Sequence, residues 1–203
     1  MSSQPAAKNV AVLGSTGSIG TSALEVINAS GGRIRAVALT AHARLDELSR
    51  QARQVKPRWV VATDDEAAAK HNWDLPAGTT LLIGDDGLRH VVTSDDVDIV
   101  LAGIVGSAGL TSTWAAIEAK KTIALANKET LVVAGSLVKR LATEHSATIL
   151  PVDSEHSAVF QALRAGQPGE VRRVVLTASG GPFRDWEPEQ LKQVTVDEAL
   201  AHP

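Results

Sequence analysis

The chain has 203 residues, of which 44% are hydrophobic and 21% charged, and its formal net charge is −3. This balance is typical of a globular protein and provides no strongly basic surface for nucleic acid. The absence of cysteine excludes disulfides, thiolate zinc sites and a cysteine nucleophile. Residues 1–8 lack the apolar segment of a signal peptide, and no apolar run approaches the ~18 residues of a membrane helix. We therefore expect a cytoplasmic protein with no nucleic-acid or membrane partner.

Short β-branched runs alternate along the chain with longer amphipathic stretches. The apolar runs predict buried strands at residues 9–13, 34–39, 59–62, 81–83, 99–102, 123–126 and 148–152. Helices are predicted between them at residues 18–28, 45–55, 64–71, 114–119 and 131–145. The first helix is expected to bury Ile19, Ala23, Val26 and Ile27. This alternation predicts an α/β fold with a doubly wound, Rossmann-like parallel sheet.

The pattern changes after the last of these strands. A helix is predicted at residues 154–163, a strand at 172–178, and a sharp break at 179–182. We therefore place a domain boundary between residues 150 and 151, giving a domain of residues 1–150 and the beginning of an α+β domain at 151–203. About fifty residues are too few for a robust second core.

A glycine-rich loop, residues 14–20 with the sequence GSTGSIG, follows the first predicted strand and opens the first helix. In that position glycines permit a tight turn and let a phosphate approach the backbone amides at the helix start. The spacing is GxxGxxG rather than GxGxxG, and no lysine follows, which excludes a P-loop. The sequence predicts a dinucleotide site; the alternative is a tight turn that binds nothing.

The end of the second predicted strand indicates which dinucleotide would bind. NAD-binding proteins usually carry a carboxylate there for the ribose 2′-hydroxyl, whereas this chain has no carboxylate and a cation at Arg44. Arg44 could pair with a 2′-phosphate, which favours NADPH. The alternative, that Arg44 is only a solvated residue at a helix start, stays open.

Two carboxylates, Asp153 and Glu155, lie where the last predicted strand leads into a helix. Such oxygen ligands suit Mg²⁺ or Mn²⁺. On these residues alone, helix capping is the favoured alternative, with Asp153 or Ser154 at the cap and Glu155 in the first turn.

Two further strand ends carry polar groups. Lys128 follows the strand at 123–126, at the sheet edge where open α/β folds bind ligands. It could polarise a substrate oxygen, with Glu129 keeping it charged, or form an ordinary ion pair at a helix start. Ser179 ends the predicted strand at 172–178, where its hydroxyl and the neighbouring amides suit a phosphate. A plain turn before Pro182 is the alternative.

Taken in order, these motifs resemble the 1-deoxy-D-xylulose 5-phosphate reductoisomerase family. The matching strings are GSTGSIG at 14–20, LANKE at 125–129, PVDSEHSA at 151–158, LTASGGPFR at 176–184 and the final AHP. The resemblance implies an NADP-dependent oxidoreductase that rearranges and reduces 1-deoxy-D-xylulose 5-phosphate to 2-C-methyl-D-erythritol 4-phosphate, in non-mevalonate isoprenoid synthesis. It implies NADPH, Mn²⁺ or Mg²⁺, a sugar-phosphate substrate and a homodimeric parent protein.

The resemblance also assigns roles to residues. NADPH would contact Thr16, Gly17, Ser18, Ile19, Asn127 and Glu129, with Arg44 in place of the family's usual lysine. Asp153 and Glu155 would bind the metal, and together with Lys128 they would be the catalytic residues. Substrate contacts would be Lys128, Ser154, Glu155, Ser179 and His202.

Two departures from the family pattern affect these expectations. Residues 42–44 read His-Ala-Arg where many members have Gly-Lys-Asn. The family also continues beyond the final His-Pro into an active-site flap, an Asn-Lys pair, another metal-binding Glu and a helical domain. We therefore expect little turnover from this chain alone. The alternatives are a non-catalytic NADPH-binding module and a different NADP-dependent dehydrogenase.

Overall fold

The computed structural model of the protein describes residues 6–177 and 181–201. The chain divides into two compact units, Met1–Asp153 and Ser154–Pro203. This division lies close to the predicted boundary between residues 150 and 151. None of the helices in the described ranges is long and apolar enough to cross a membrane.

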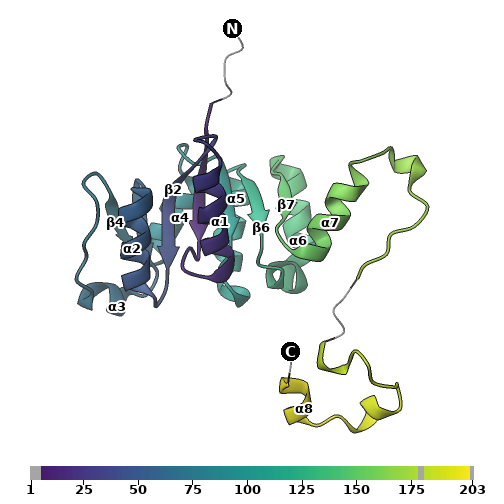
Figure 1. Ribbon diagram of the computed structural model, residues 1–203. Helices are drawn as coiled ribbons and strands as arrows, with labels where there is room; N and C mark the ends of the chain where they lie inside the picture. Colours follow the sequence, from purple (N-terminus) through teal and green to yellow (C-terminus); the bar gives the residue numbers. More distant parts are fainter. Residues whose placement is uncertain (1–5, 178–180, 202–203) are drawn as a thin grey trace. The chain divides into compact units, whose positions relative to one another are not determined.

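The first unit is built on one parallel sheet (Figure 1). The strand order is β4-β3-β2-β1-β5-β6-β7, and every neighbouring pair is parallel. The strands are β1 (Lys8–Leu13), β2 (Ile34–Ala41), β3 (Trp59–Ala62), β4 (Thr80–Ile83), β5 (Ile99–Ala102), β6 (Thr122–Leu125) and β7 (Ile149–Pro151). The predicted α/β fold with a doubly wound sheet is confirmed.

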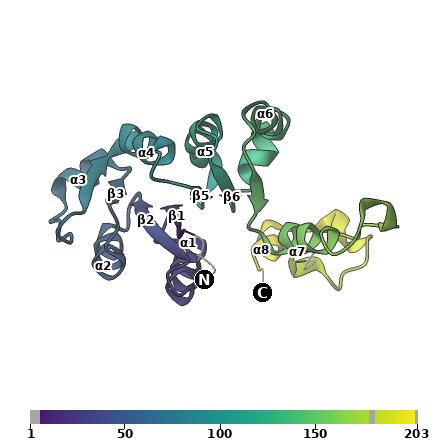
Figure 2. The ribbon, with the colours of Figure 1, turned by 90° about the horizontal axis from the view of Figure 1, so that it is seen from above.

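Helices cover both faces of this sheet, which is why its central strands are apolar on both sides (Figure 2). On one face lie α1 (Ser18–Ala29) and α2 (Leu45–Val55). On the other lie α4 (Gly84–Thr93), α5 (Gly109–Glu118) and α6 (Glu129–His145). The short α3 (Asp65–Lys70) connects β3 to β4.

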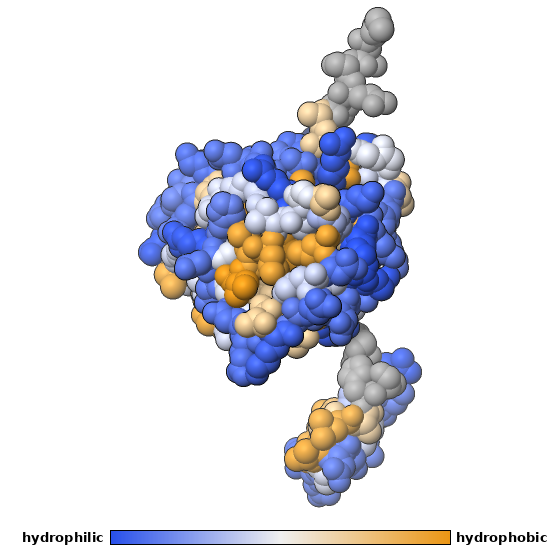
Figure 3. All heavy atoms as spheres, turned by 90° about the vertical axis from the view of Figure 1, so that its left-hand side faces the viewer, coloured by the Kyte–Doolittle hydropathy of each residue, from blue (hydrophilic) through white to orange (hydrophobic). Residues whose placement is uncertain are grey.

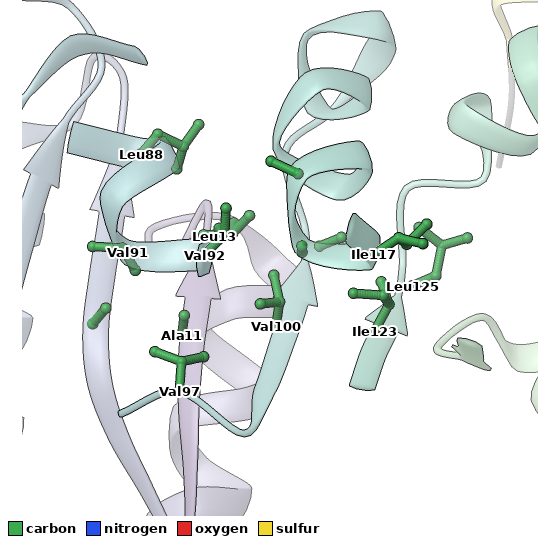
Figure 4. Close-up of a cluster of buried hydrophobic side chains, with 14 of the residues drawn as sticks. Ala11, Leu13, Leu88, Val91, Val92, Val97, Val100, Ile117, Ile123 and Leu125 are labelled. Atoms are coloured by element: carbon green, nitrogen blue, oxygen red, sulfur yellow. The ribbon is translucent and has the colours of Figure 1, made fainter. Parts of the chain in front are cut away.

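The core consists of two clusters, one on each face of the sheet. Figure 4 shows Leu13 of β1 beside Val92 of α4, in the same cluster as Val100 of β5 and Ile117 of α5. Val12, the neighbour of Leu13, belongs to the cluster under α1 and α2, because successive side chains of a strand point to opposite faces. Burying one such side chain stabilises the fold by roughly 1.5–3 kcal/mol.

Several local predictions are wrong in detail. Helix α4 was not predicted, and α5 begins five residues before the predicted residue 114, at Gly109. Helix α1 buries Gly20 and Leu24, whereas Ile19 and Val26 are exposed. The predicted face is right in part, since Ala23 and Ile27 are half-buried against the core cluster. Four residues in a short helix define its orientation only approximately until it docks.

The edge strand β4 is only partly covered. Leu81 and Leu82 are half-buried and Ile83 is exposed. The side of the unit on which β4 lies shows an apolar area surrounded by polar side chains (Figure 3).

The second unit contains α7 (Ser154–Leu163) and α8 (Val196–Leu200), joined by three short 3₁₀ turns at Pro168–Glu170, Gly181–Phe183 and Gln190–Gln193. None of its described residues is buried. The strand predicted at residues 172–178 is not formed between 172 and 177, and residue 178 lies outside the described residues. Val174, Val175 and Leu176 are more than half exposed there. A β-branched run becomes a strand only when another strand pairs with it.

Candidate functional site

The strand order changes direction at β1, because β2 lies on one side of it and β5 on the other. In open α/β sheets, ligands bind in the crevice outside the carboxyl ends of the strands at this point. The loops that follow β1, β2 and β5 line a cleft there of about 250 Å³. Its walls include Gly14, Thr16 and Gly17, then residues 40–44, then residues 103–105.

Two glycines of the loop at 14–20 are required by close backbone contacts. Gly14 has φ +71°, and a Cβ there would lie 2.9 Å from the carbonyl oxygen of Gly103. A Cβ on Gly20 would lie 2.5 Å from the Gly14 oxygen and from the Ser15 backbone. The loop is therefore folded tightly beneath the start of α1 and against the loop after β5.

The start of α1 suits an anion. Gly17 is the N-cap residue and makes no side-chain cap, and the first turn carries no acidic residue. By contrast, α2, α3 and α4 each have two acidic residues in the first turn. Among the described residues, no group accepts a hydrogen bond from the amides of Thr16, Ser18 or Ile19. Unpaired amides and the positive helix dipole together favour a phosphate.

The loop after β2 places the side chains of Arg44 and His42 at the cleft. Arg44 is exposed, is the N-cap residue of α2 and lines the cleft. The Arg50 guanidinium, with a smaller contribution from Arg44, lowers the pKa of Glu47. His42 is exposed and its Nδ1 lies 3.2 Å from the hydroxyl of Thr63. The sequence left two alternatives for Arg44, a residue at a helix start and a ligand contact. The structure places Arg44 both at the start of α2 and on the wall of the cleft.

Asn127, at the end of β6, is buried and is held by the chain itself. Its side-chain nitrogen donates to the carbonyl oxygens of Ile104 and Gly106, the latter at 2.8 Å. Its oxygen accepts from the Thr130 amide at 3.2 Å. The side chain therefore fixes the loop after β5 that forms one wall of the cleft. Glu129, predicted as a cofactor contact, lies half-buried in the first turn of α6.

The ends of β6 and β7 bring a predicted substrate residue to a predicted metal residue. Lys128 Nζ lies 3.6 Å from Asp153 Oδ2, with the lysine side chain 64% exposed and the aspartate 13%. The ion pair described for Lys128 is thus with Asp153, rather than with the neighbouring Glu129. The Lys128 ammonium is exposed and can also meet a ligand oxygen, whereas the Asp153 carboxylate beside it is largely buried.

The second predicted carboxylate belongs to the second unit. Helix α7 begins at Ser154 and has Glu155 in its first turn, as the capping alternative predicts. The Ser154 hydroxyl donates to Glu155 Oε2 at 2.7 Å. In the described part of the chain no three His, Asp or Glu side chains form a group that could hold a metal. The carboxylate oxygens of Asp153 and Glu155 are ligands that Mg²⁺ or Mn²⁺ prefers, but the two residues alone do not make up a three-ligand group. Ser179 and His202 lie outside the described residues.

A family model for 1-deoxy-D-xylulose 5-phosphate reductoisomerase matches residues 10–135, and a model for the C-terminal domain of the same enzyme matches residues 149–203. The chain belongs to this family. It is therefore not a member of an unrelated NADP-dependent dehydrogenase family, which was one of the alternatives.

Individual reductoisomerases are similar over almost the whole chain. The protein of Bacteroides thetaiotaomicron is 52% identical over 97% of this chain and 50% of its own length, and that of Geotalea uraniireducens is 48% identical over 97% and 51%. The Zymomonas mobilis enzyme in complex with NADPH superposes with a TM-score of 0.82 at 39% identity, over 97% of this chain and 52% of its own. A reductoisomerase complex with NADPH, fosmidomycin and magnesium superposes with a TM-score of 0.80 at 41% identity, over 97% of this chain and 51% of its own length. The chain spans about half the length of the reductoisomerases it matches.

Three residues that support the glycine loop were not predicted from the sequence. Ser15, Thr40 and Gln51 form a buried hydrogen-bond network under the glycine loop. Thr40 could have been found as a polar residue ending an apolar strand. Gln51 carries no local signal, because its contact depends on how α2 packs against β1 and β2.

Proposed function

We propose that this chain supplies the NADPH site and part of the substrate site of a 1-deoxy-D-xylulose 5-phosphate reductoisomerase. The reaction would yield 2-C-methyl-D-erythritol 4-phosphate in non-mevalonate isoprenoid synthesis. The observation that carries this proposal is the cleft at the ends of β1, β2 and β5, with free amides at the start of α1. Membership in a family whose solved structures include NADPH complexes supports it.

The cleft residues fit the parts of NADPH. The amides of Thr16, Ser18 and Ile19 would donate to the pyrophosphate, and Gly14 and Gly17 would let it approach. Arg44 would pair with the 2′-phosphate at the end of β2, where a carboxylate would repel it. When bound, NADPH supplies the hydride, while the protein orients it and excludes water.

The substrate end would be formed around Lys128 and Asp153. Lys128 would place fixed positive charge near the reacting oxygen or the substrate phosphate, and Asp153 would hold that lysine in position. Asp153 and Glu155 would hold Mn²⁺ or Mg²⁺, which polarises a carbonyl when bound. Ser154, Ser179 and His202 would contact the substrate. We further propose functional domains at 1–150 and 151–203, a cytoplasmic location and a homodimeric whole protein.

A fluorescence titration of the chain with NADPH and NADH tests the cofactor proposal. We expect saturable NADPH binding, at least about tenfold tighter than NADH, since a paired 2′-phosphate adds a charge-assisted contact. Equal affinity for both would contradict the assignment of Arg44.

The proposed reaction is tested on the whole protein, where NADPH oxidation should require both 1-deoxy-D-xylulose 5-phosphate and Mn²⁺ or Mg²⁺. Turnover without the sugar phosphate would contradict the proposed reaction.

One observation favours a second candidate, a non-catalytic NADPH-binding module. The described residues lack a three-ligand metal group. Measuring NADPH affinity with and without Mn²⁺, and with a substrate analogue present, separates the two candidates. A module would bind NADPH identically in every condition, whereas a catalytic site would couple the ligands.

A further inference from the structure

The glycine loop is held from below by a buried glutamine of another element. Gln51 lies in α2 and is 2% exposed, and Ser15 of the loop is fully buried. The Ser15 hydroxyl donates to Gln51 Oε1 at 2.8 Å, and Gln51 Nε2 donates to the Ser15 carbonyl oxygen at 3.0 Å. Glutamine is seldom buried, because its amide must find partners for both ends. Here each end is paired with the same loop residue.

The strand β2 completes this network. The Ser15 amide donates to the Thr40 carbonyl oxygen and the Gly14 amide donates to the Thr40 hydroxyl, both at 2.9 Å. The Ser15 hydroxyl also lies 3.3 Å from the Thr40 carbonyl oxygen. Ser15 is thus fixed at its amide by β2, at its hydroxyl by β2 and α2, and at its carbonyl by α2. The hydrogen bond from Gln51 to the carbonyl decides the orientation of the peptide that links Ser15 to Thr16.

That orientation determines where the next amide points. The chain has no cis peptide among its described residues, and in a trans peptide the C=O and N–H bonds point in opposite directions. Because the Ser15 carbonyl is turned toward Gln51, the Thr16 N–H is turned away from it. Thr16 lines the cleft, and no described group accepts from its amide. The amide is left available for a ligand oxygen.

We propose that Gln51 is a positioning residue for the pyrophosphate of the dinucleotide, acting through Ser15 to direct the Thr16 amide. It contacts no ligand itself. The inference rests on the proposed NADPH site and adds a residue 36 positions away from the loop to it. Without the Gln51 donor, the Ser15–Thr16 peptide can rotate, and the preorganised phosphate contact is lost.

The test compares Gln51→Met, which keeps the side-chain length but has no hydrogen-bond donor, with Gln54→Met, an exposed residue one turn further along α2. Each variant is titrated with NADPH and with 2′-AMP, which has the adenosine and 2′-phosphate but no pyrophosphate. We expect Gln51→Met to weaken NADPH binding about tenfold and to leave 2′-AMP binding unchanged. Gln54→Met should change neither.

A second variant guards against loss of folding, checked by circular dichroism. Gln51→Glu keeps an acceptor for the Ser15 hydroxyl but, when ionised, has no donor for the Ser15 carbonyl. It should show the same selective loss. Unchanged NADPH affinity in both variants, or an equal loss of NADPH and 2′-AMP, would overturn the inference. A wild-type chain that binds 2′-AMP but not NADPH would do the same. No binding of either ligand would instead contradict the proposed function on which it rests.

Discussion

At Gly20 the cleft depends on the absence of a side chain. A methyl group there would meet the Gly14 oxygen and the Ser15 backbone at 2.5 Å, and backbone atoms have little room to yield. We expect Gly20→Ala to weaken NADPH binding by more than tenfold and to cost about 1–3 kcal/mol of stability. NADPH titration and thermal unfolding measure both effects.

Gly135 in α6 provides the matched control for this substitution. A Cβ there would find its nearest neighbour at 3.7 Å, an ordinary contact. Gly135→Ala should leave NADPH binding unchanged and stabilise the helix by up to about 1 kcal/mol. If both alanine variants behaved alike, the close packing at Gly20 would not be what shapes the loop.

The charge of Arg44 makes a different prediction, since it concerns the choice of cofactor. Arg44→Ala removes the cation that would face the 2′-phosphate, so NADPH affinity should fall about tenfold while NADH affinity stays the same. Arg35→Ala is the control, because Arg35 is exposed near the opposite end of β2. Equal weakening of both cofactors by Arg44→Ala would place Arg44 in a structural role.

Among the elements, α1 differs from α2, α3 and α4 in having no acidic residue in its first turn. Adding one by Ser18→Glu should have opposite effects on stability and binding. The new carboxylate would interact favourably with the helix dipole and stabilise the helix by about 0.3–1 kcal/mol, but it would repel the cofactor phosphates. We expect an equal or higher melting temperature together with weaker NADPH binding, most clearly at low salt.

Ser22→Glu tests whether this effect is local. Ser22 is exposed one turn further along the same helix, so its charge lies farther from the free amides. It should reduce NADPH affinity much less than Ser18→Glu does. Parallel changes in the two variants would show only a general effect of net charge.

The elements also show what sequence can predict. Residues 10–13 of β1 and the whole of β3 and β5 are continuous apolar runs, and burial on both faces of the sheet is what such runs predict. Helix α4 was not predicted because it begins Gly-Asp-Asp-Gly and has few apolar residues. The run at 172–177 has the composition of a strand, but strand formation requires a partner strand.

At the site, local motifs predicted the glycine loop and Arg44, because strand, loop and helix follow one another directly. The residues left the roles of Lys128 and Asp153 open between ligand binding and an ordinary helix start, and the family resemblance chose the first. In the structure their side chains lie 3.6 Å apart. Neither the local motifs nor the family resemblance predicted a role for Gln51. Its contact with Ser15 depends on the docking of α2 against the sheet, which no local pattern encodes.

For the whole molecule, the contrast between the units is one of burial. The first unit has apolar clusters on both faces of its sheet, whereas the described residues of the second have none buried. Because buried apolar surface is the main source of folding stability, we attribute the folding stability measured on this chain to the first unit.

That stability should depend on pH through Asp98, which ties β1 to the start of β5. The Asn9 amide donates to Asp98 Oδ2 at 2.8 Å, and Lys8 Nζ lies 3.1 Å from Oδ1. The Asn9 hydrogen bond, aided by Lys8, lowers the pKa of Asp98 from its ordinary value of 3.8. A depressed folded-state pKa means that the ionised carboxylate stabilises the fold above the ordinary value. This stabilisation is lost as the pH falls through the lower, folded-state pKa.

Asp98→Asn should therefore destabilise the first unit at pH 7 and make little difference in strong acid. Because the side chain is 38% exposed, we expect only about 1 kcal/mol, or roughly 3 °C in melting temperature. Asp95→Asn is the control, because Asp95 is an exposed acid in the preceding turn. It should change neither the free energy of unfolding nor the melting temperature. Melting curves from pH 7 down to about pH 2 measure the difference between each variant and wild type. A deficit in Asp98→Asn that stayed constant across this range would mean that packing, and not the carboxylate charge, accounts for it.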